Sequence, residues 1–343
     1  MRKQRMVFTM LAALALTVLC GCGGGKGGEP ETSAGSMAPP EGTTDTSVSA
    51  NVPEGSVVSG GKVFSLITMD TIDQFWLQVK EGAQAKADEL GVNLRFDAPV
   101  GKTDAQAQSD MVENAISNGV DGIIISPTNK EALAPAIDKA KEAGIPVVYA
   151  GTMCSSENYL ASYTTDNYAA GEKAAQELAG LLGQKGQVAV ICAQQGDDSG
   201  QQRQQGFCDY VGKEYPDMEV VQVVYSDGEA EKAMNLTTNL LATYPELKGI
   251  FSINEGSTIG MAQGLSQSGM PEGFACIGFD LSDNTRASIA DGSINGVIVQ
   301  DPEGMGSESV EALFSYLENQ EEPESRDTFT QSFFVTKDNL DQF

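Results

Sequence analysis

The 343-residue sequence contains no histidine and few basic residues. Without imidazole there is no histidine-ligated metal site, no histidine general base and no Ser-His-Asp triad. Lysine and arginine number 21 against 48 acidic residues, so the formal net charge is −27. A surface of this charge repels nucleic acid and anionic lipid head groups. The composition therefore excludes several enzyme classes and predicts no nucleic-acid partner.

Six cysteines are present, and none belongs to a CxxC pair or another metal-binding spacing. Neither a zinc site nor a redox motif is therefore predicted. Cys192 and Cys276 lie in strand-like runs and are expected to be buried, whereas Cys208 lies in a helical pattern and Cys154 in a loop. A disulfide among these four is left open. There is also no glycine-rich phosphate loop and no nucleophile elbow. We predict no cofactor, no metal and no catalytic residue, although paired carboxylates could in principle hydrolyse glycosides.

The amino-terminal residues have the pattern of a targeting segment. A basic start at residues 2–5 precedes an apolar run over residues 6–19, which has signal-peptide length and is too short to favour a spanning helix. The run ends in Leu-Cys-Gly-Cys at residues 19–22, which resembles a bacterial lipobox with Cys22 as the lipidated residue. Lipidation at Cys20, or an ordinary cleaved signal peptide, are the alternatives. We expect a protein lipid-anchored on the extracytoplasmic face of the cell membrane.

Residues 1–21 would then be the signal peptide and residues 22–61 a tether. The tether is rich in Gly, Ser, Thr and Pro and has almost no large apolar side chains. Such a segment cannot bury enough surface to order itself. A flexible chain of this length spans roughly 35 Å, which lets a folded body move above a membrane.

From Lys62 onward, short apolar runs alternate with segments of helical spacing. Strands separated by helices of this length form parallel βαβ units with helices on both faces. A first series of strands is expected at 63–68, 92–96, 122–126 and 146–150, and a second at 187–193, 219–225, 249–253, 275–279 and 296–299. Helices are expected up to Leu90 and over 105–118, 130–143, 168–182, 200–215, 229–243, 257–268, 284–290 and 305–317, before an extended tail at 328–335. Two doubly wound α/β sheets in series are the economical interpretation.

The segment Asp70–Trp76 joins the first strand to the first helix. Loops at the carboxyl ends of parallel strands are where such sheets bind ligands. This loop carries two carboxylates, an amide, Phe75 and the only tryptophan, Trp76. Aromatic faces beside hydrogen-bonding groups suit a sugar. The alternative is that both aromatic residues belong only to the core of the first helix.

Eight short motifs occur in an order that resembles one family. They are FW-x-x-VKEGAQ at 75–84, GVDGIIISP at 119–127, AGIPVV at 143–148, TDN-x-x-AG at 165–171, Q-x-R-x-x-GF at 201–207, NE at 254–255, IGFD at 277–280 and VQ at 299–300. Together they are similar to the ribose-type, cluster B sugar-binding proteins of ABC importers. The similarity covers about residues 62–336.

This resemblance implies the type I periplasmic-binding-protein fold, in which two Rossmann-like doubly wound parallel-sheet lobes are joined by a three-strand hinge. The implied crossings lie near 164–166, 300–302 and 329–331. The implied amino-terminal lobe is 62–164 plus 303–328, and the implied carboxyl-terminal lobe is 166–300 plus 329–343. A ligand would be clamped between the two lobes.

The resemblance also implies a set of ligand-binding residues. Gln201 stands where the family usually has a ligand-binding arginine, and Arg203 matches a second basic position of structural type. A sugar hydroxyl both donates and accepts, so buried Asp, Asn and Gln side chains can pair with it, and a wrong ligand would leave them unpaired. The implied ligand-binding residues are Asp73, Phe75, Trp76, Thr152, Gln201, Asn254, Asp280 and Gln300.

Two departures from the family pattern argue against ribose itself. Gly151-Thr152 stands where ribose-type proteins carry an Asp-Arg pair, and a carboxyl-lobe aromatic residue of the family falls at about Gly228. We therefore expect a pocket with less charge and more room on one side. The alternatives are that Asp280 and Asn254 only cap helices and that Gln300 only bonds backbone.

The leading hypothesis is a monomeric lipoprotein that captures a sugar-like molecule and delivers it to an ABC transporter permease. The alternative is a receptor that presents such a ligand to a chemoreceptor or sensor kinase. A transcription regulator of the lactose-repressor type would need a helix-turn-helix where the lipobox lies. The membrane would be contacted through the lipid anchor only.

Overall fold

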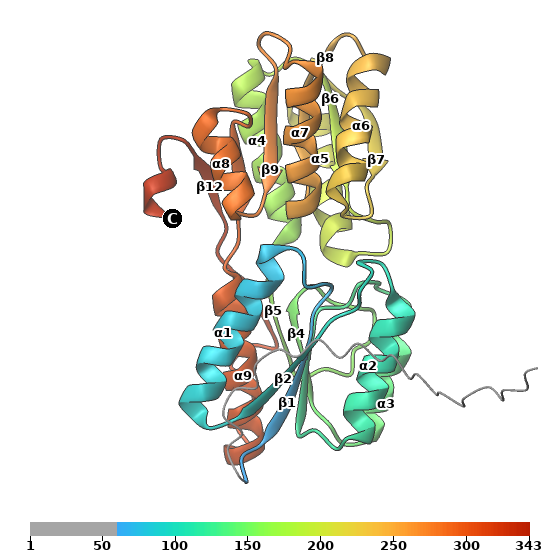
Figure 1. Cartoon of the computed structure of the whole chain (residues 1–343), viewed down its shortest axis with the longest axis vertical. Helices are drawn as coiled ribbons and strands as arrows, with labels where there is room; N and C mark the ends of the chain where they lie inside the picture. Colours follow the sequence, from blue (N-terminus) through green and yellow to red (C-terminus); the bar gives the residue numbers. More distant parts are fainter. Residues whose placement is uncertain (1–59) are drawn as a thin grey trace, which may run out of the picture. The chain divides into compact units, whose positions relative to one another are not determined.

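The computed structural model describes residues 60–343, which form two α/β lobes (Figure 1). The predicted signal peptide, Cys22 and nearly all of the predicted tether lie outside the described residues. Those assignments therefore stay predictions. No helix between residues 60 and 343 is long and apolar enough to cross a membrane.

The first lobe is built on a parallel six-stranded sheet in the order β11-β5-β4-β3-β1-β2. Its strands are β1 (Val63–Ile67), β2 (Asn93–Asp97), β3 (Gly122–Ile125), β4 (Val147–Gly151), β5 (Ala161–Thr165) and β11 (Asp327–Thr330). Its helices are α1 (Gln74–Leu90), α2 (Ala105–Ser117), α3 (Ala134–Glu142) and α9 (Pro302–Asn319). The helices α1 and α9 share one apolar core with the sheet, and α2 and α3 share another.

A close approach of α1 and α9 ties the last long helix to the first lobe. A Cβ atom at Gly82 would lie 2.0 Å from the Glu303 carbonyl oxygen, and one at Gly306 would lie 2.0 Å from the Val79 carbonyl oxygen. Only glycine permits backbones to pack this tightly. The helix α9 is therefore part of the first lobe, although it follows the second lobe in sequence.

The second lobe has a six-stranded sheet in the order β12-β10-β9-β8-β6-β7. Its strands are β6 (Gly186–Cys192), β7 (Met218–Tyr225), β8 (Leu247–Ser252), β9 (Ala275–Phe279), β10 (Gly296–Val299) and β12 (Phe333–Thr336), of which β12 is antiparallel to β10. Its helices are α4 (Asn167–Leu182), α5 (Asp198–Glu214), α6 (Ala230–Thr243), α7 (Glu255–Ser268) and α8 (Asp283–Asp291), followed by the 3₁₀ turn η1 (Leu340–Gln342). Both faces of this sheet are covered by apolar cores, and the α/β fold class is confirmed.

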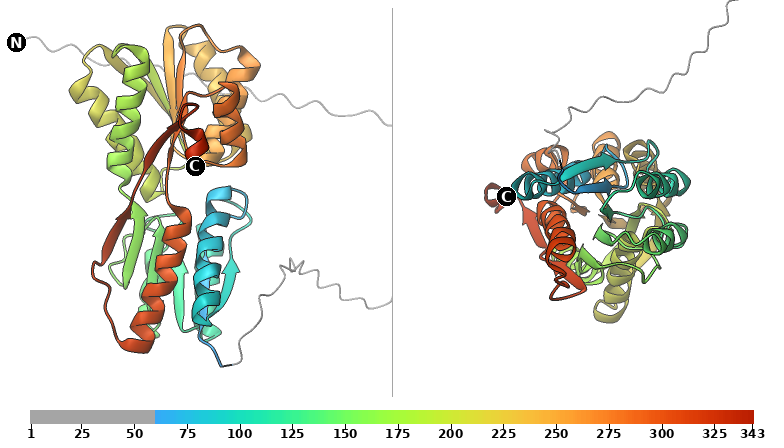
Figure 2. Two further views of the ribbon diagram at one scale, coloured as in Figure 1. Left: turned by 90° about the vertical axis from the view of Figure 1, so that its left-hand side faces the viewer. Right: turned by 90° about the horizontal axis from the view of Figure 1, so that it is seen from below.

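Within residues 60–343 the chain passes between the lobes three times. It crosses after β5, after β10 and after β11, and Figure 2 shows β11 and β12 following one another from the first lobe to the second. The last crossing comes two residues later than the predicted boundary at 329. Phe329 and Thr330 still pair with Thr164 and Thr165 of β5, which holds them in the first sheet.

Two elements differ from the sequence prediction. The strand β5 was expected only as a crossing, because its residues Ala161–Thr165 are mostly small or hydroxylated, yet all of them are buried. The helix α3 begins at Ala134 and not at 130, because the Asn129 side chain accepts hydrogen bonds from the amides of Glu131 and Ala132 and holds a turn there. In both sheets the loops that follow the parallel strands lie at the interface between the lobes.

Candidate functional site

A cavity lies between the two lobes and opens to solvent. The empty space between its lining residues is about 540 Å³, open solvent at its mouth included. The first lobe contributes Asp70, Asp73, Phe75, Trp76, Lys102 and Gly151 to its wall. The second lobe contributes Gln194, Asp197, Arg203, Asp227, Gly228, Asn254, Asp280 and Gln300, among others. Six of the eight predicted ligand-binding residues therefore meet in one place.

Phe75 and Trp76 form the aromatic part of the wall. Each is 7% exposed, and their rings meet edge to face with centroids 4.7 Å apart. Both also belong to the core of the first lobe. A place in the helix core and a place in the cavity wall are therefore compatible for this pair. A Cβ atom at Gly151 would lie 3.1 Å from Cζ3 of Trp76. The room expected at Gly151 is therefore occupied by the indole ring.

Thr152 lies behind the cavity and does not line it. Its side chain is buried, and Oγ1 donates to Asp197 Oδ1 across the lobes at 3.5 Å. Asp197 caps α5, accepting hydrogen bonds from the Gly200 amide and the Ser199 hydroxyl. Thr152 thus contacts the second lobe instead of the cavity.

Gln201 is exposed on α5 and donates to the carbonyl of Gln195, away from the cavity. Arg203 is buried and lines the cavity. Two residues along a helix are separated by about 200°, so only one of the pair can face inward. The structure therefore places Arg203, and not Gln201, in the wall of the cavity.

Arg203 is held by three hydrogen bonds and an aromatic ring. Its Nε donates to Asn167 Oδ1 at 2.8 Å, Nη1 to the Ile253 carbonyl at 2.8 Å and Nη2 to Gln300 Oε1 at 2.9 Å. The guanidinium carbon lies 3.8 Å from the centroid of the Phe279 ring. A guanidinium has five N–H donors, so two remain available to a ligand. Burial lowers the pKa of Arg203.

Gln300 and Asp280 extend this network along the floor of the cavity. Gln300 Nε2 donates to Asp280 Oδ1 at 2.6 Å, and its Oε1 also accepts from Thr165 Oγ1 at 2.7 Å. Asp280 Oδ2 accepts from the Glu255 amide at 3.1 Å. Burial raises the pKa of Asp280, while Arg203 and Gln300 oppose the shift. Gln300 therefore bonds side chains. The Asp280 side chain accepts from the first amide of α7, while its backbone carbonyl accepts from Thr285 Oγ1 of α8.

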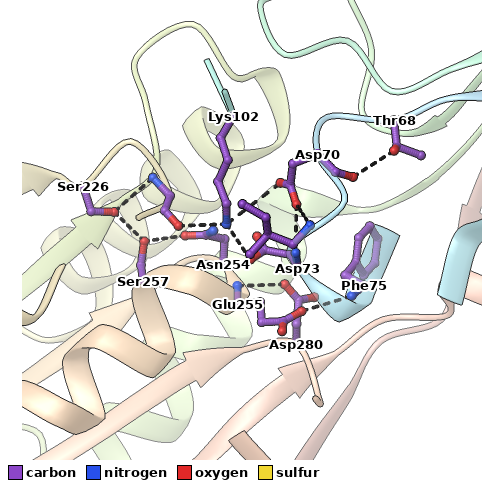
Figure 3. Close-up of polar contacts among 12 residues, drawn as sticks. Thr68, Asp70, Asp73, Phe75, Lys102, Ser226, Asn254, Glu255, Ser257 and Asp280 are labelled. Carbon is purple, nitrogen blue, oxygen red and sulfur yellow. Dashed lines mark hydrogen bonds and ion pairs between the residues drawn. The ribbon is translucent and has the colours of Figure 1, made fainter. Parts of the chain in front are cut away.

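Asn254 stands at the N-cap position of α7 but makes no side-chain capping bond. Its Oδ1 accepts from Ser257 Oγ, and Ser257 in turn shares a 2.7 Å hydrogen bond with Ser226 (Figure 3). Within the described part of the chain, Asn254 Nδ2 donates to no protein group. That amide is available to a ligand in the cavity.

Lys102 is a wall residue that the sequence prediction missed. Its Nζ lies 2.5 Å from Asp73 Oδ1 and 3.9 Å from Asp70 Oδ2, and it donates to the Gly228 carbonyl at 3.1 Å (Figure 3). The room expected beside Gly228 therefore contains a lysine side chain. Its place in a loop after a parallel strand was the available sequence signal.

Three ionisable side chains, Asp70, Asp73 and Lys102, lie together in this part of the cavity wall. Burial and the neighbouring Asp70 carboxylate raise the pKa of Asp73 to about 8, although Lys102 opposes the shift. Burial lowers the pKa of Lys102, but the Asp73 and Asp70 carboxylates outweigh burial and leave it raised. Lys102 is therefore a cation at neutral pH.

The lobes touch each other around the cavity. Glu255 Oε2 accepts from the Phe75 amide at 3.0 Å, and Gln74 Oε1 accepts from the Asp283 amide at 2.9 Å. On another side, Lys130 Nζ lies 2.6 Å from Asp198 Oδ1. These contacts describe a closed arrangement of the lobes. Burial raises the pKa of Glu255, an effect opposed by the Phe75 amide.

Residues 60–343 contain neither a candidate metal site nor a disulfide. No group of three or more acidic or cysteine side chains there is placed to hold a metal ion. The four cysteines of this part, among which the sequence leaves a disulfide open, have free thiols.

Two parallel-sheet lobes, three crossings and a cavity between them define a two-lobed solute-binding protein. The family model for the periplasmic binding protein domain matches residues 64–321, and the chain belongs to this family. The expected type I fold and the resemblance to ribose-type proteins are confirmed.

Individual relatives agree with this assignment. A ribose import binding protein of Bacillus subtilis (strain 168) is 28% identical over 244 residues, which are 71% of this chain and 77% of that protein. A solute binding protein of an ABC transporter from Agrobacterium vitis, with bound D-fucose, has a TM-score of 0.79 and 34% identity and covers 82% of this chain and 97% of its own. A carbohydrate transporter solute binding protein from Agrobacterium radiobacter, in complex with D-arabinose, has a TM-score of 0.79 and 30% identity, over 82% and 96% of the two chains. The relatives are binding proteins, and the chain is not an enzyme.

Proposed function

We propose that this protein captures a sugar between its two lobes and delivers it to the permease of an ABC importer. In this proposal the lipid on Cys22 holds it at the extracytoplasmic face of the membrane, where it acts as a monomer. Its folded part contacts the permease, and only the lipid enters the membrane. The relatives named above, with ribose, D-fucose and D-arabinose as their ligands, support the sugar class.

The arrangement of Arg203 opposite the aromatic pair carries the proposal. Arg203 has two N–H groups to donate from the second lobe, and Phe75 and Trp76 present apolar faces from the first. Sugars have apolar C–H faces and polar edges, so they match a wall of this kind. A ligand that touches both walls would favour the closed arrangement.

The ligand-binding residues that we propose are the predicted ones that line the cavity, together with Arg203. Thr152 and Gln201 are not among them, because neither lines the cavity. The proposed set is Asp73, Phe75, Trp76, Arg203, Asn254, Asp280 and Gln300.

A thermal unfolding screen tests the sugar class directly. Pentoses, hexoses, polyols and nucleosides would each be added to the mature protein. A ligand that binds only the folded state stabilises it by about 2.7 kcal/mol at a concentration 100 times Kd. We expect at least one monosaccharide to raise the melting temperature. If only nucleosides or no compound did so, the sugar assignment would be wrong.

A further inference from the structure

Lys102 places a buried ammonium group in the wall of the cavity. Its side chain is 7% exposed and comes from the loop between β2 and α2. Its Nζ reaches Asp73 Oδ1, the Gly228 carbonyl oxygen and, at 3.9 Å, Asp70 Oδ2 (Figure 3). An ammonium group has three N–H donors. Asp73 and Gly228 take two of these donors, and the Asp70 carboxylate adds an ion pair without a hydrogen bond. A ligand would have to compete with these oxygens for the ammonium group.

The oxygens around the ammonium are held in place by other contacts. Asp70 is 2% exposed, and its Oδ1 accepts from the amides of Ile72 at 2.7 Å and Asp73 at 2.8 Å. The Gly228 amide donates to Ser226 Oγ at 3.2 Å. Two buried carboxylates side by side need a cation or a proton between them. The three oxygens therefore form a prearranged position for an ammonium group.

Gly228 lies beside the lysine stem. Its backbone has φ +74°, and a Cβ atom there would lie 3.4 Å from Lys102 Cδ and 3.5 Å from Asn254 Nδ2. Both are ordinary contact distances, so the positive φ is what favours glycine at this position. The pair of Lys102 and Gly228 thus forms one wall of the cavity.

We propose that Lys102 is a specificity-determining residue: its ammonium group fills a cation subsite formed by Asp70, Asp73 and the Gly228 carbonyl, so that the cavity accepts uncharged sugars and rejects sugars with their own ammonium group. The part that concerns sugars rests on the proposed function. A second ammonium beside Lys102 would meet a like charge in a buried place, where charges interact strongly. Removal of the lysine leaves the two carboxylates without a cation. The cavity then favours sugars with an ammonium group over uncharged sugars.

The subsite can be tested without knowing the sugar. Lys102→Ala removes a fragment with the shape of propylammonium, which would be added back to the folded variant. We expect propylammonium to raise the melting temperature of Lys102→Ala by several degrees, and an equal concentration of 1-propanol or sodium chloride to have much less effect. The wild type should not respond, because its own lysine fills the subsite. If 1-propanol were as effective as propylammonium, or if neither acted, the proposed cation subsite would be refuted.

A matched control is Lys139→Ala. Lys139 pairs with Glu113 on the surface of the first lobe, with side chains 56% and 50% exposed. Propylammonium should not stabilise this variant, since an exposed pair leaves no enclosed position. An equal response of both variants would reduce the effect to general ion binding and overturn the proposal.

A double variant covers the case in which Lys102→Ala does not fold alone. Lys102→Ala/Asp73→Asn removes the cation together with one of its carboxylates. It should fold, melt at a higher temperature than Lys102→Ala and no longer respond to propylammonium. If the double variant also failed to fold, Lys102 would be needed for packing and the proposal would be wrong.

A sugar comparison then tests specificity. D-glucose and D-galactose would be compared with D-glucosamine and D-galactosamine, in the wild type and in Lys102→Ala. We expect the ratio of amino-sugar to neutral-sugar affinity to rise at least tenfold in the variant. If a neutral sugar and its amino derivative both bind and this ratio is unchanged or lower, the specificity role is refuted. If no sugar of the full screen bound either protein, the proposed function would be wrong, and so would the specificity role that rests on it. The propylammonium result would still decide whether the cation subsite exists.

Discussion

Glu255 of the second lobe accepts a 3.0 Å hydrogen bond from the backbone amide of Phe75 in the first lobe. Phe75 lies in the first turn of α1, whose N-cap residue Asp73 makes no side-chain capping bond. The first amides of a helix need acceptors, and a carboxylate there also interacts favourably with the helix dipole. An amide at the start of α1 thus obtains its acceptor from across the cavity, so this contact favours lobe closure.

We therefore expect Glu255→Ala to weaken ligand binding by shifting the lobes toward an open state. A hydrogen bond to a charged group contributes roughly 1.5–3 kcal/mol, so Kd should rise at least tenfold. The measurements are calorimetric titration and solution scattering with and without the sugar. The wild type should become more compact when the sugar is added, and the variant less so.

Glu272→Ala, at an exposed position, should behave like the wild type. Equal compaction and affinity in both variants would contradict a role of Glu255 in closure.

Arg203 and Gln201 offer a matched pair of substitutions on one helix. Arg203→Met should reduce affinity by more than about 100-fold, because it removes donors to the ligand and leaves Gln300 Oε1 without one of its two donors. Gln201→Ala should bind within about twofold of the wild type, since its side chain is exposed. Titration calorimetry of both variants checks this. Normal binding by Arg203→Met would remove the arginine from the site.

Trp76 should report binding through its fluorescence, because the only indole of the chain lines the cavity. Trp76→Leu should weaken binding by roughly 1–3 kcal/mol through the loss of aromatic contact area. Trp76→Phe should keep more of the affinity. Trp76 also packs in the core, so the melting temperature of each variant must be measured beside its Kd. Two variants that melt earlier but bind normally would assign Trp76 to the core alone.

Stability should fall as pH rises through the range in which Asp73 titrates. The pKa of Asp73 is about 8 in the folded protein and about 4 for an unfolded aspartate. The folded state therefore binds this proton more tightly, and stability decreases between about pH 4 and about pH 8. Asp73→Asn should make the profile of melting temperature against pH shallower. Asp283→Asn, at an exposed position, should leave it unchanged. An identical slope in the wild type and Asp73→Asn would contradict the raised pKa.

Cys22→Ala tests the predicted lipid anchor. We expect the variant to be released from membranes or to remain unprocessed, because the lipobox would have no acceptor at that position. Membrane fractionation with a radioactive lipid label measures both outcomes. A variant that stays labelled would point to Cys20, and an unlabelled wild type would reject lipidation.

Part of the candidate site followed from one strand end. Asp73, Phe75 and Trp76 lie in or beside the loop after the first strand, and the carboxyl ends of parallel strands are where such sheets bind ligands. The resemblance to ribose-type proteins added Asn254, Asp280 and Gln300. Thr152 and Gln201 were placed wrongly relative to the cavity, because the choice of side that a residue faces depends on local turns and on helix phase.

The sequence by itself determined the alternation of strands and helices and indicated two α/β sheets in series, because apolar periodicity and glycine positions are local properties of the chain. The two lobes with three crossings were implied by the resemblance to ribose-type proteins. Only the tertiary structure decided how the lobes meet. Lys102 pairs with Asp73 and Gly228, residues far from it in sequence, and Glu255 reaches Phe75 over 180 positions. The energies of such contacts arise from burial and proximity across the cavity, which no local pattern encodes.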